Sequence, residues 1–244
     1  MKLTIIGCDG AYPSKNGATS GYLIEDNNTK VLLDCGSGVL SHLQNYINLE
    51  DLDGVVFSHF HPDHCADLVC LQYSALIESI YNDRSKPLYM WGAGSKKEID
   101  DLTYNKYCLG NSFANKNNFT IGDFTFSTSL NKHNVESYSI KATDSKGKTL
   151  VYSGDTAYYP GLIPFSKESD CFLCECSLFN SEYGKISGHL TAGEVGIISK
   201  EANVKSLILT HLPHYGILEN LIAEAKEKYN GIIYLAKKGM TLTI

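Results

Sequence analysis

Three histidines and one aspartate stand within six residues, in the string His59-Phe60-His61-Pro62-Asp63-His64. Neutral imidazole and carboxylate groups are ligands that Zn²⁺, Mn²⁺ and Fe²⁺ share. The string follows the strand-like residues 55–58, so several imidazoles would leave the end of one strand together. A lone histidine would favour a plain polar loop, but four such groups exceed what one tetrahedral ion takes from one loop. The spacing therefore predicts two metal ions.

Two other apolar runs end at a single side chain that can bind metal. Residues 150–153 lead, past one glycine, to Asp155, and residues 207–210 lead to His211. Because ligands gather at the carboxyl ends of strands in α/β sheets, we expect both side chains to join the histidine string. His133 also follows a strand-like run. By itself it is typical of a surface loop, but the need for a further ligand favours it as part of the site.

Together these motifs resemble those of the metallo-β-lactamase superfamily, and in particular its ribonuclease Z and phosphodiesterase branch. The resemblance spans nearly the whole chain. Beyond the histidine string it rests on His133-Asn134-Val135-Glu136-Ser137-Tyr138, Gly154-Asp155-Thr156 and Gly188-His189-Leu190-Thr191-Ala192. It implies an α+β fold, an αββα four-layer sandwich in which two mixed β-sheets pack on each other with helices outside.

The resemblance also implies which residues hold each metal. The expected ligands are His59, His61 and His133 for the first ion, Asp63, His64 and His211 for the second, and Asp155 as the bridge between them. Two such ions, about 3.5 Å apart, lower the pKa of a bridging water so that hydroxide exists near neutral pH. We therefore expect two divalent cations as cofactors, with Zn²⁺ as the first choice and Mn²⁺ or Fe²⁺ as alternatives.

Three residues carry catalytic roles by the same resemblance: Asp63, His189 and Glu175. In that branch the histidine matching His189 lies over the metals and contacts the scissile phosphate or protonates the leaving oxygen, oriented by the glutamate that aligns with Glu175. A histidine tuned by a carboxylate suits general-acid work near neutral pH. The alternatives are a side chain near the start of a helix for His189 and a buried structural role for Glu175. Asp34 and Asp67 could orient ligand histidines or serve turns and caps.

The expected activity is hydrolysis of a phosphodiester, either a small or cyclic one or an RNA 3′ end. Unlike ribonuclease Z, the chain has too short an interval between His133 and Asp155 to contain a tRNA-binding arm. The net charge of −6 and the presence of only one arginine, Arg84, also disfavour an extended nucleic-acid track. RNA therefore stays open as a substrate but a small-molecule phosphodiester is favoured.

Two other functions compete with this interpretation. The same metal pair could hydrolyse a lactone or carboxylic ester, although Gly188-His189-Leu190-Thr191 suits a phosphate better than an acyl group. A redox or non-catalytic dimetal protein is the third hypothesis. A redox centre of this family usually has an acidic ligand where His61 stands, and buried ionisable clusters are costly to keep without metal.

The elements that must position these residues alternate between strands and helices. Strands are predicted at residues 2–8, 20–25, 30–34, 55–58, 88–91, 119–129, 137–143, 150–153, 171–176, 206–210, 232–236 and 240–244. Helices are predicted at residues 39–46, 64–80, 96–104, 191–201 and 218–229, and a loop at the polar residues 104–118. No linker separates the two halves, so we predict a single domain of residues 1–244.

Composition sets the remaining expectations. With 43% hydrophobic residues, the 244-residue chain can bury a substantial core. No window resembles a membrane span, and the first residues read as a strand rather than a signal peptide, so we expect a cytoplasmic protein without a membrane partner.

We expect free thiols at the eight cysteines. A buried strand is favoured over a metal site for Cys171, Cys174 and Cys176. Because proteins of the family that the sequence resembles often form dimers, we expect a homodimer.

Overall fold

The computed structural model describes residues 1–82 and 84–244, which form two seven-stranded sheets. The first sheet has the order β14 (Thr241–Thr243), β1 (Lys2–Gly7), β2 (Gly21–Asp26), β3 (Thr29–Leu33), β4 (Gly54–Val56), β5 (Leu88–Gly92) and β6 (Cys108–Ser112). The second has the order β13 (Ile232–Leu235), β12 (Ser206–Thr210), β11 (Cys171–Glu175), β10 (Thr149–Tyr152), β9 (Tyr138–Thr143), β8 (Phe124–Leu130) and β7 (Phe119–Ile121). Both are mixed: β3 to β6 run parallel in one and β10 to β13 in the other.

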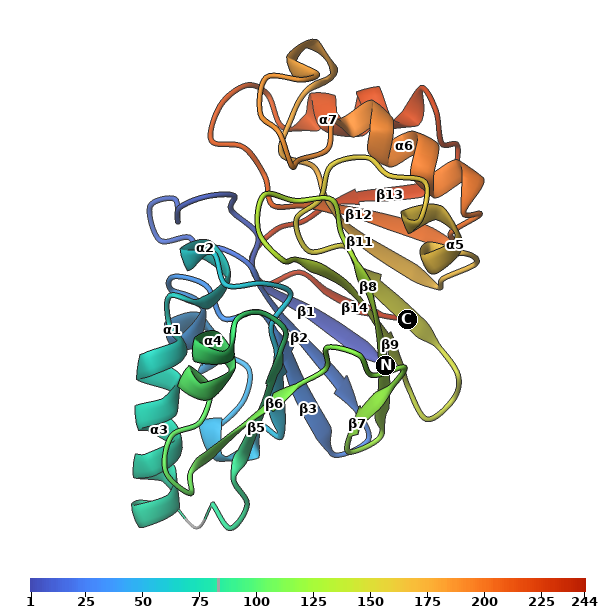
Figure 1. Cartoon of the computed structure of the whole chain (residues 1–244). Helices are drawn as coiled ribbons and strands as arrows, with labels where there is room; N and C mark the ends of the chain where they lie inside the picture. Colours follow the sequence, from blue (N-terminus) through green and yellow to red (C-terminus); the bar gives the residue numbers. More distant parts are fainter. Residues whose placement is uncertain (83) are drawn as a thin grey trace.

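Helices cover the outer faces of both sheets (Figure 1). The α-helices of the described residues are α1 (Val39–Leu43), α2 (Pro62–Cys65), α3 (Leu68–Tyr81), α4 (Lys96–Asp101), α5 (Leu162–Ser166), α6 (Ala192–Glu201) and α7 (Glu219–Lys226). Helices α1 to α4 accompany the first sheet, and α5 to α7 accompany the second (Figure 1). The predicted αββα sandwich is therefore confirmed.

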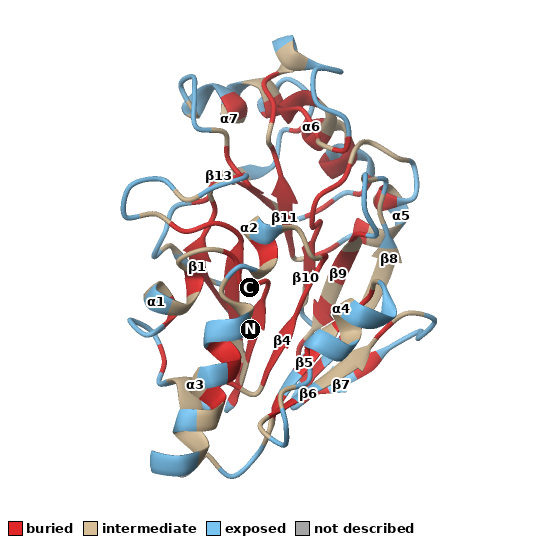
Figure 2. Cartoon of the chain, turned by 60° about the vertical axis from the view of Figure 1, so that its left-hand side comes forward, coloured by how far each residue is buried: buried red, intermediate tan, exposed pale blue. Residues whose placement is uncertain are grey.

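Apolar side chains fill one core that both sheets share and a second core beneath α1 and α3. Figure 2 shows the central strands almost entirely buried, while the helices keep an exposed outer side. Polar contacts also join the sheets. The hydroxyl of Tyr22, on β2, lies 2.8 Å from that of Thr210, on β12, and the Tyr22 ring lies 4.9 Å from that of Tyr152, on β10. The two sheets are thus held face to face close to the strand ends that carry the predicted ligands.

The prediction of a loop at residues 104–118 is wrong, because this segment contains strand β6. It pairs in parallel with β5, with Cys108 opposite Leu88 and Ser112 opposite Gly92. Only Cys108 is buried in this strand, and the other four residues are partly or fully exposed. An edge strand of this composition lacks an apolar alternation, so backbone pairing with β5 decides its structure.

The helix predicted at residues 64–80 begins earlier and is divided into α2 and α3. Pro62 lies in the first turn of α2. A backbone N–H at this position would have no partner within the helix, so proline, which lacks this group, is tolerated there. Between the two helices, Cys35 donates its N–H to the carbonyl of His64 at 2.8 Å and accepts the N–H of Asp67 at 3.1 Å. The turn that follows β3 therefore takes up backbone groups that a continuous helix would use.

Two smaller differences concern turns and a short helix. The strand predicted at residues 119–129 is a hairpin of β7 and β8, which turns at Gly122 with a φ of 52°. Glycine adopts this left-handed conformation without the strain that a side chain would add. Helix α5 was not predicted, because its five residues are too few to show a helical period.

Phe172 offers a test of the shared core. It lies on β11 and is fully buried in the core that both sheets share. We expect Phe172→Ala to lower the free energy of unfolding by about 3–5 kcal/mol, because it removes a large buried ring and leaves a cavity. Urea titration followed by circular dichroism measures this value. Tyr81→Ala, at a residue 76% exposed, is the control and should change the free energy by less than about 0.5 kcal/mol.

Candidate metal centre

The predicted ligands lie at the carboxyl ends of strands from both sheets. His59 and His61 follow β4, and α2 then carries Asp63 and His64. Asp155 follows β10 and His211 follows β12, in the second sheet. Since the sheets pack face to face, these strand ends meet at one edge of the sandwich. His133 reaches the same edge from the loop after β8.

The structure brings all seven predicted ligands into two adjoining groups. One group is His59, His61, His133 and Asp155, and the other is Asp63, His64, Asp155 and His211. Within each group, one ligand atom per residue lies within 4.8 Å of the others. Asp155 belongs to both groups, in the position expected for a bridging ligand.

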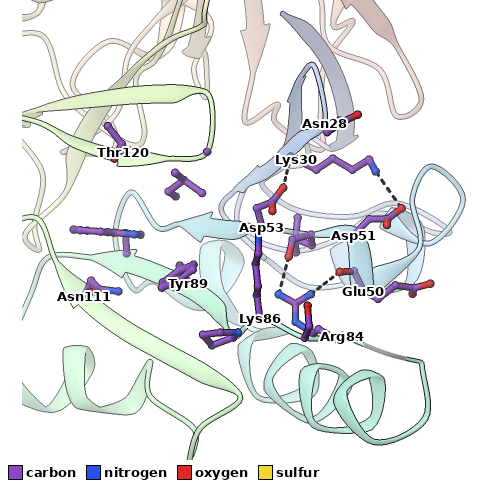
Figure 3. Close-up of a pocket in the computed structure, with 16 residues that line it drawn as sticks. Asn28, Lys30, Glu50, Asp51, Asp53, Arg84, Lys86, Tyr89, Asn111 and Thr120 are labelled. Carbon is purple, nitrogen blue, oxygen red and sulfur yellow. Dashed lines mark hydrogen bonds and ion pairs between the residues drawn. The ribbon is translucent and has the colours of Figure 1, made fainter.

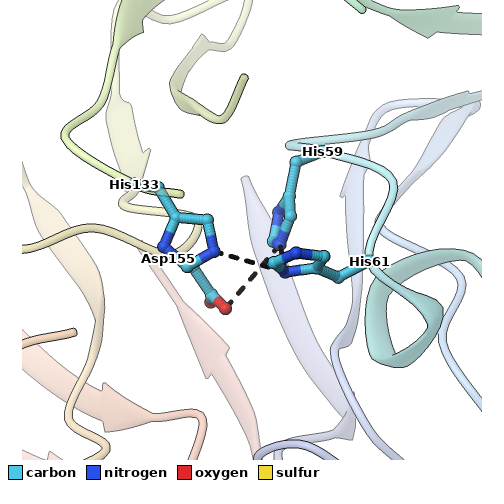
Figure 4. A group of neighbouring side chains, drawn as sticks. All are labelled: His59, His61, His133 and Asp155. Atoms are coloured by element: carbon cyan, nitrogen blue, oxygen red, sulfur yellow. Dashed lines mark hydrogen bonds and ion pairs between the residues drawn. The ribbon is translucent and has the colours of Figure 1, made fainter. Parts of the chain in front are cut away.

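In the first group, the imidazoles point at one another across a small space (Figure 4). Nδ1 of His61 lies 3.1 Å from Nε2 of His59 and 3.2 Å from Nε2 of His133. Nε2 of His59 lies 3.7 Å from Oδ2 of Asp155. Three ring nitrogens and a carboxylate oxygen therefore converge.

The second group has the same character around the shared carboxylate of Asp155. Nε2 of His64 lies 3.3 Å from Oδ1 of Asp155. Nε2 of His211 lies 3.4 Å from Oδ2 of Asp155 and 3.1 Å from Oδ2 of Asp63. Two imidazoles and two carboxylates face one another here.

Two atoms in this edge lack the partners that buried polar atoms normally have. Nε2 of His64 and Oδ1 of Asp155 are buried, and neither forms a hydrogen bond with any described residue. Leaving such groups unpaired costs about 1–3 kcal/mol each. A divalent cation between them would satisfy both, and the nitrogen and oxygen donors are those that Zn²⁺, Mn²⁺ and Fe²⁺ accept. The residues present therefore fit a pair of divalent metal ions.

Asp34 orients His64 through the ring nitrogen that faces away from the second group. It is fully buried after β3 and accepts a hydrogen bond from Nδ1 of His64 at 2.7 Å, which leaves Nε2 to face the second group. Its carboxylate also accepts the N–H of Ser58 at 2.7 Å, the Ser58 hydroxyl at 2.8 Å and the Tyr152 hydroxyl at 2.7 Å. Asp67 contacts no ligand histidine in the structure: its carboxylate accepts the N–H of Leu40 at 2.9 Å. Asp34 therefore orients a histidine, whereas Asp67 stabilises the start of α1.

Other histidines are oriented in the same way, by partners that the sequence did not reveal. Nδ1 of His133 donates to the carbonyl of Gly188 at 2.8 Å. Nδ1 of His211 lies 2.8 Å from the hydroxyl of Ser177, which itself donates to Glu175 at 2.7 Å. Each contact leaves Nε2 of the ring for the site. Ser177 had one available signal, its place two residues after Glu175 at the end of β11.

The charges at this edge are strongly coupled. Burial raises the pKa of Asp155, but the charges of His211 and His64 outweigh it and hold the pKa well below its usual value. Burial lowers the pKa of His64, yet Asp155 and Asp34 raise it well above normal. Burial holds the pKa of His59 well below normal. The ionised carboxylates thus demand positive charge, which bound cations can supply.

His189 lies beside these groups and is oriented by Glu175. Nδ1 of His189 lies 3.1 Å from Oε1 of Glu175, and the His189 ring lies 5.3 Å from that of His133 and 5.4 Å from that of His211. Burial lowers the pKa of His189, but the charge and hydrogen bond of Glu175 outweigh it and raise the pKa to about 9. Thr191 caps α6 instead, in a capping box with Glu194. His189 lies two residues before this cap, and its own printed side-chain contacts are with Glu175 and Ser177.

Glu175 has both a structural and an orienting contact set. It is fully buried at the end of β11, where Oε1 accepts the N–H of Thr156 at 2.8 Å and Oε2 accepts the N–H of Leu190 at 3.3 Å. Glu175, His189 and His211 also form a third close group of metal-competent side chains. Because backbone and hydroxyl donors already occupy both oxygens of Glu175, we assign it to orientation and not to metal binding.

A cavity of about 670 Å³ lies away from this site. It lies at the opposite ends of the strands, where Asp53 precedes β4 (Figure 3). Two of its cations are already paired: Lys30 with Asp51 at 3.1 Å, and Arg84 with the carbonyls of residues 49, 50 and 52. Its lining contains no histidine or cysteine and none of the clusters of possible metal ligands found among the described residues.

The structure also describes the cysteines and the character of the helices. All eight cysteines are free, and Cys171, Cys174 and Cys176 are buried, as packing in a strand requires. No helix among the described residues combines the length and the apolar character that a membrane span needs.

Comparison with known proteins places the chain in a family. A family model for the β-lactamase superfamily domain matches residues 29–212. The chain is 40% identical over 240 residues to the probable metallo-hydrolase YhfI of Bacillus subtilis, with 98% of each protein covered. The crystal structure of YhfI has a TM-score of 0.96 at 38% identity, covering 99% of this chain and 98% of that one. The chain belongs to the metallo-β-lactamase superfamily.

More distant similarity reaches proteins of the ribonuclease Z type. Ribonuclease Z of Myxococcus xanthus is 23% identical over 305 aligned positions, covering 100% of this chain and 98% of that protein. The crystal structure of the short form of human tRNase Z has a TM-score of 0.78 at 19% identity, covering 100% of this chain and 99% of that one. At this identity the structural likeness establishes a common fold alone.

Removal of the shared carboxylate tests the ligand assignment. We expect Asp155→Ala to lower the metal content of the purified protein clearly below that of the unmodified chain, because both groups lose the ligand that joins them. Elemental analysis by mass spectrometry measures it. Asp100→Ala, at an exposed carboxylate on α4, is the control and should bind metal normally. An Asp155 variant with unchanged metal content would show that the assignment is wrong.

Proposed function

We propose that this protein is a dinuclear metal-dependent phosphodiesterase that acts on a small or cyclic phosphodiester. The observation that carries the proposal is a shared carboxylate, Asp155, between two ligand groups, with His189 held beside them by Glu175. A phosphodiester is a poor electrophile that gains negative charge when attacked. It needs positive charge, a nucleophile and a proton donor within one small space.

When bound, two divalent ions would supply Lewis-acid charge and lower the pKa of a water molecule. The residues of the chain then have distinct tasks. Asp155 and the histidines hold their donor atoms converged, so that little reorganisation is needed. Asp63, whose side chain is 11% exposed, would hold a proton of the attacking water on its carboxylate.

His189 is proposed to act on the opposite side of the phosphate. Glu175 fixes its Nδ1, so Nε2 is the ring nitrogen that can reach a substrate oxygen. There it would hydrogen-bond the phosphate and donate a proton to the leaving oxygen. The pairing with Glu175 keeps the ring in one orientation through this step.

The relatives support hydrolytic chemistry of this kind. YhfI carries the name of a probable metallo-hydrolase, and the more distant relatives include ribonuclease Z, whose substrates contain phosphodiesters. A small substrate is favoured over RNA. Between His133 and Asp155 the chain provides a loop, β9, a turn and β10, and no arm, and its net charge is −6.

A substrate panel separates this proposal from its main competitor. We expect the metal-loaded protein to hydrolyse bis-p-nitrophenyl phosphate or a cyclic nucleotide at least about tenfold faster than an acyl lactone at equal concentration, a difference of about 1.4 kcal/mol in barrier height. Product release is followed by absorbance and chromatography. Selective turnover of the lactone would establish the carboxylic ester hydrolase in its place.

His189→Ala tests the proton donor separately from metal binding. We expect the turnover number to fall by about 10²–10⁴-fold while the metal content stays that of the unmodified protein, because His189 is no ligand in this scheme. His42→Ala, at a histidine on α1 remote from the site, is the matched control and should retain full rate. Loss of metal from the His189 variant would instead indicate a ligand role.

A further inference from the structure

A cavity of about 470 Å³ adjoins the metal centre on the side of His189. Its lining includes both His133 and His189, so it opens directly onto the first ligand group. The remaining walls come from the loop after β8, the turn after β10, the loop between β11 and α6, and Glu194 on α6. This volume suits a small organic ligand, and it lies where a group attached to a metal-held phosphate would extend.

The walls of this cavity are aromatic and aliphatic. Tyr158 is half-buried and Leu178 is 2% exposed. The loop before α6 contributes Tyr183 at 74% exposure and Ile186 at 53% exposure to the same lining. Large apolar side chains left exposed side by side around a concave site favour a ligand that covers them. We call the part of the cavity lined by Tyr158, Leu178, Tyr183 and Ile186 the tyrosine pocket.

Charge distinguishes the tyrosine pocket from the cavity on the other side of the centre. Lys132 is the only lysine or arginine among the lining residues. The one carboxylate, Glu194, belongs to the capping box of α6 and accepts a hydrogen bond from the Thr191 hydroxyl at 2.8 Å. The other cavity, of about 250 Å³ beside His61, is lined by two carboxylates, Glu98 and Glu136. The His61 side thus presents two carboxylates and no lysine or arginine to an anionic ester, whereas the side of His189 presents Lys132 and Glu194.

We propose that the tyrosine pocket binds a planar aromatic group esterified to the phosphate, with Lys132 facing the anionic charge of the same substrate. The proposal rests on the proposed phosphodiesterase function, because that function places the phosphate at the metal groups. Tyr183 and Tyr158 supply the aromatic rings of this pocket, and Leu178 is its most buried side chain. The preferred substrates are thus aryl or nucleoside phosphodiesters, not simple alkyl ones.

The test compares two probes that differ only in the organic group. Phenyl phosphate and methyl phosphate are titrated by calorimetry into the metal-loaded protein. We expect phenyl phosphate to bind about tenfold more tightly, since an aromatic contact of this kind contributes on the order of a factor of ten. Tyr183→Ala should remove most of this preference and leave the affinity for methyl phosphate unchanged. Tyr183→Phe should retain it.

Controls separate the pocket from folding and from the other cavity. Tyr183 is exposed, so its replacement does not disturb the core, and Tyr81→Ala on α3 removes an equally exposed tyrosine far from the site. Lys132→Ala should weaken both probes by the same factor. Equal binding of the two phosphates, absence of measurable phenyl phosphate binding, or an unchanged preference in Tyr183→Ala would each overturn the proposal. So would loss of the preference in Val135→Ala, on the His61 side.

The two proposals can fail independently. If the aromatic preference depends on Tyr183 but no phosphodiester is hydrolysed, the pocket is supported and the proposed activity is wrong. If bis-p-nitrophenyl phosphate is hydrolysed without any preference for phenyl over methyl phosphate, the activity is supported and the pocket is wrong.

Discussion

Ionised carboxylates buried between two sheets require positive charge, and this requirement organises the whole edge of the sandwich. Asp155 is 2% exposed and Asp34 is fully buried. An isolated charge in such a place is costly unless it is paired and hydrogen-bonded. Imidazoles surround these carboxylates, and those of His64, His133 and His211 are oriented through the ring nitrogen that faces away from the site. Asp34 holds His64 and Ser177 holds His211, so that the inner nitrogens and Asp155 converge where cations would complete the balance.

The same contacts couple the site to the packing of the sheets. Asp34 stands at the end of a strand of the first sheet, and the Tyr152 hydroxyl reaches it from the second. The hydroxyl groups of Tyr22 and Thr210 form a second contact between the sheets, from β2 to β12. A change in the distance between the sheets would therefore misplace both ligand groups at once. This explains why the ligands come from strand ends, where the backbone is held by pairing on both sides.

The proposed basis of substrate choice, by contrast, lies in the loops. The strands and their terminal ligands supply a common centre, while the walls of the adjoining cavities come from connecting segments. The loop between β11 and α6 carries both His189 and the exposed Tyr183, and so combines a proposed catalytic contact with a proposed binding contact. Loops on a rigid scaffold can change in this way without disturbing the centre.

The sequence by itself determined the ligand chemistry, because spacing along the chain is a local property. The string His59 to His64 and the strand-terminal Asp155 and His211 are visible without any coordinates, and the alternating elements indicate the sandwich. Tertiary structure decided what depends on contacts between distant residues. Tyr152 reaches Asp34 across 118 positions of sequence, β6 exists because β5 offers it a partner, and Ser177 matters only because His211 lies beside it. No local pattern encodes such pairs, since their hydrogen bonds form only after the sheets have packed.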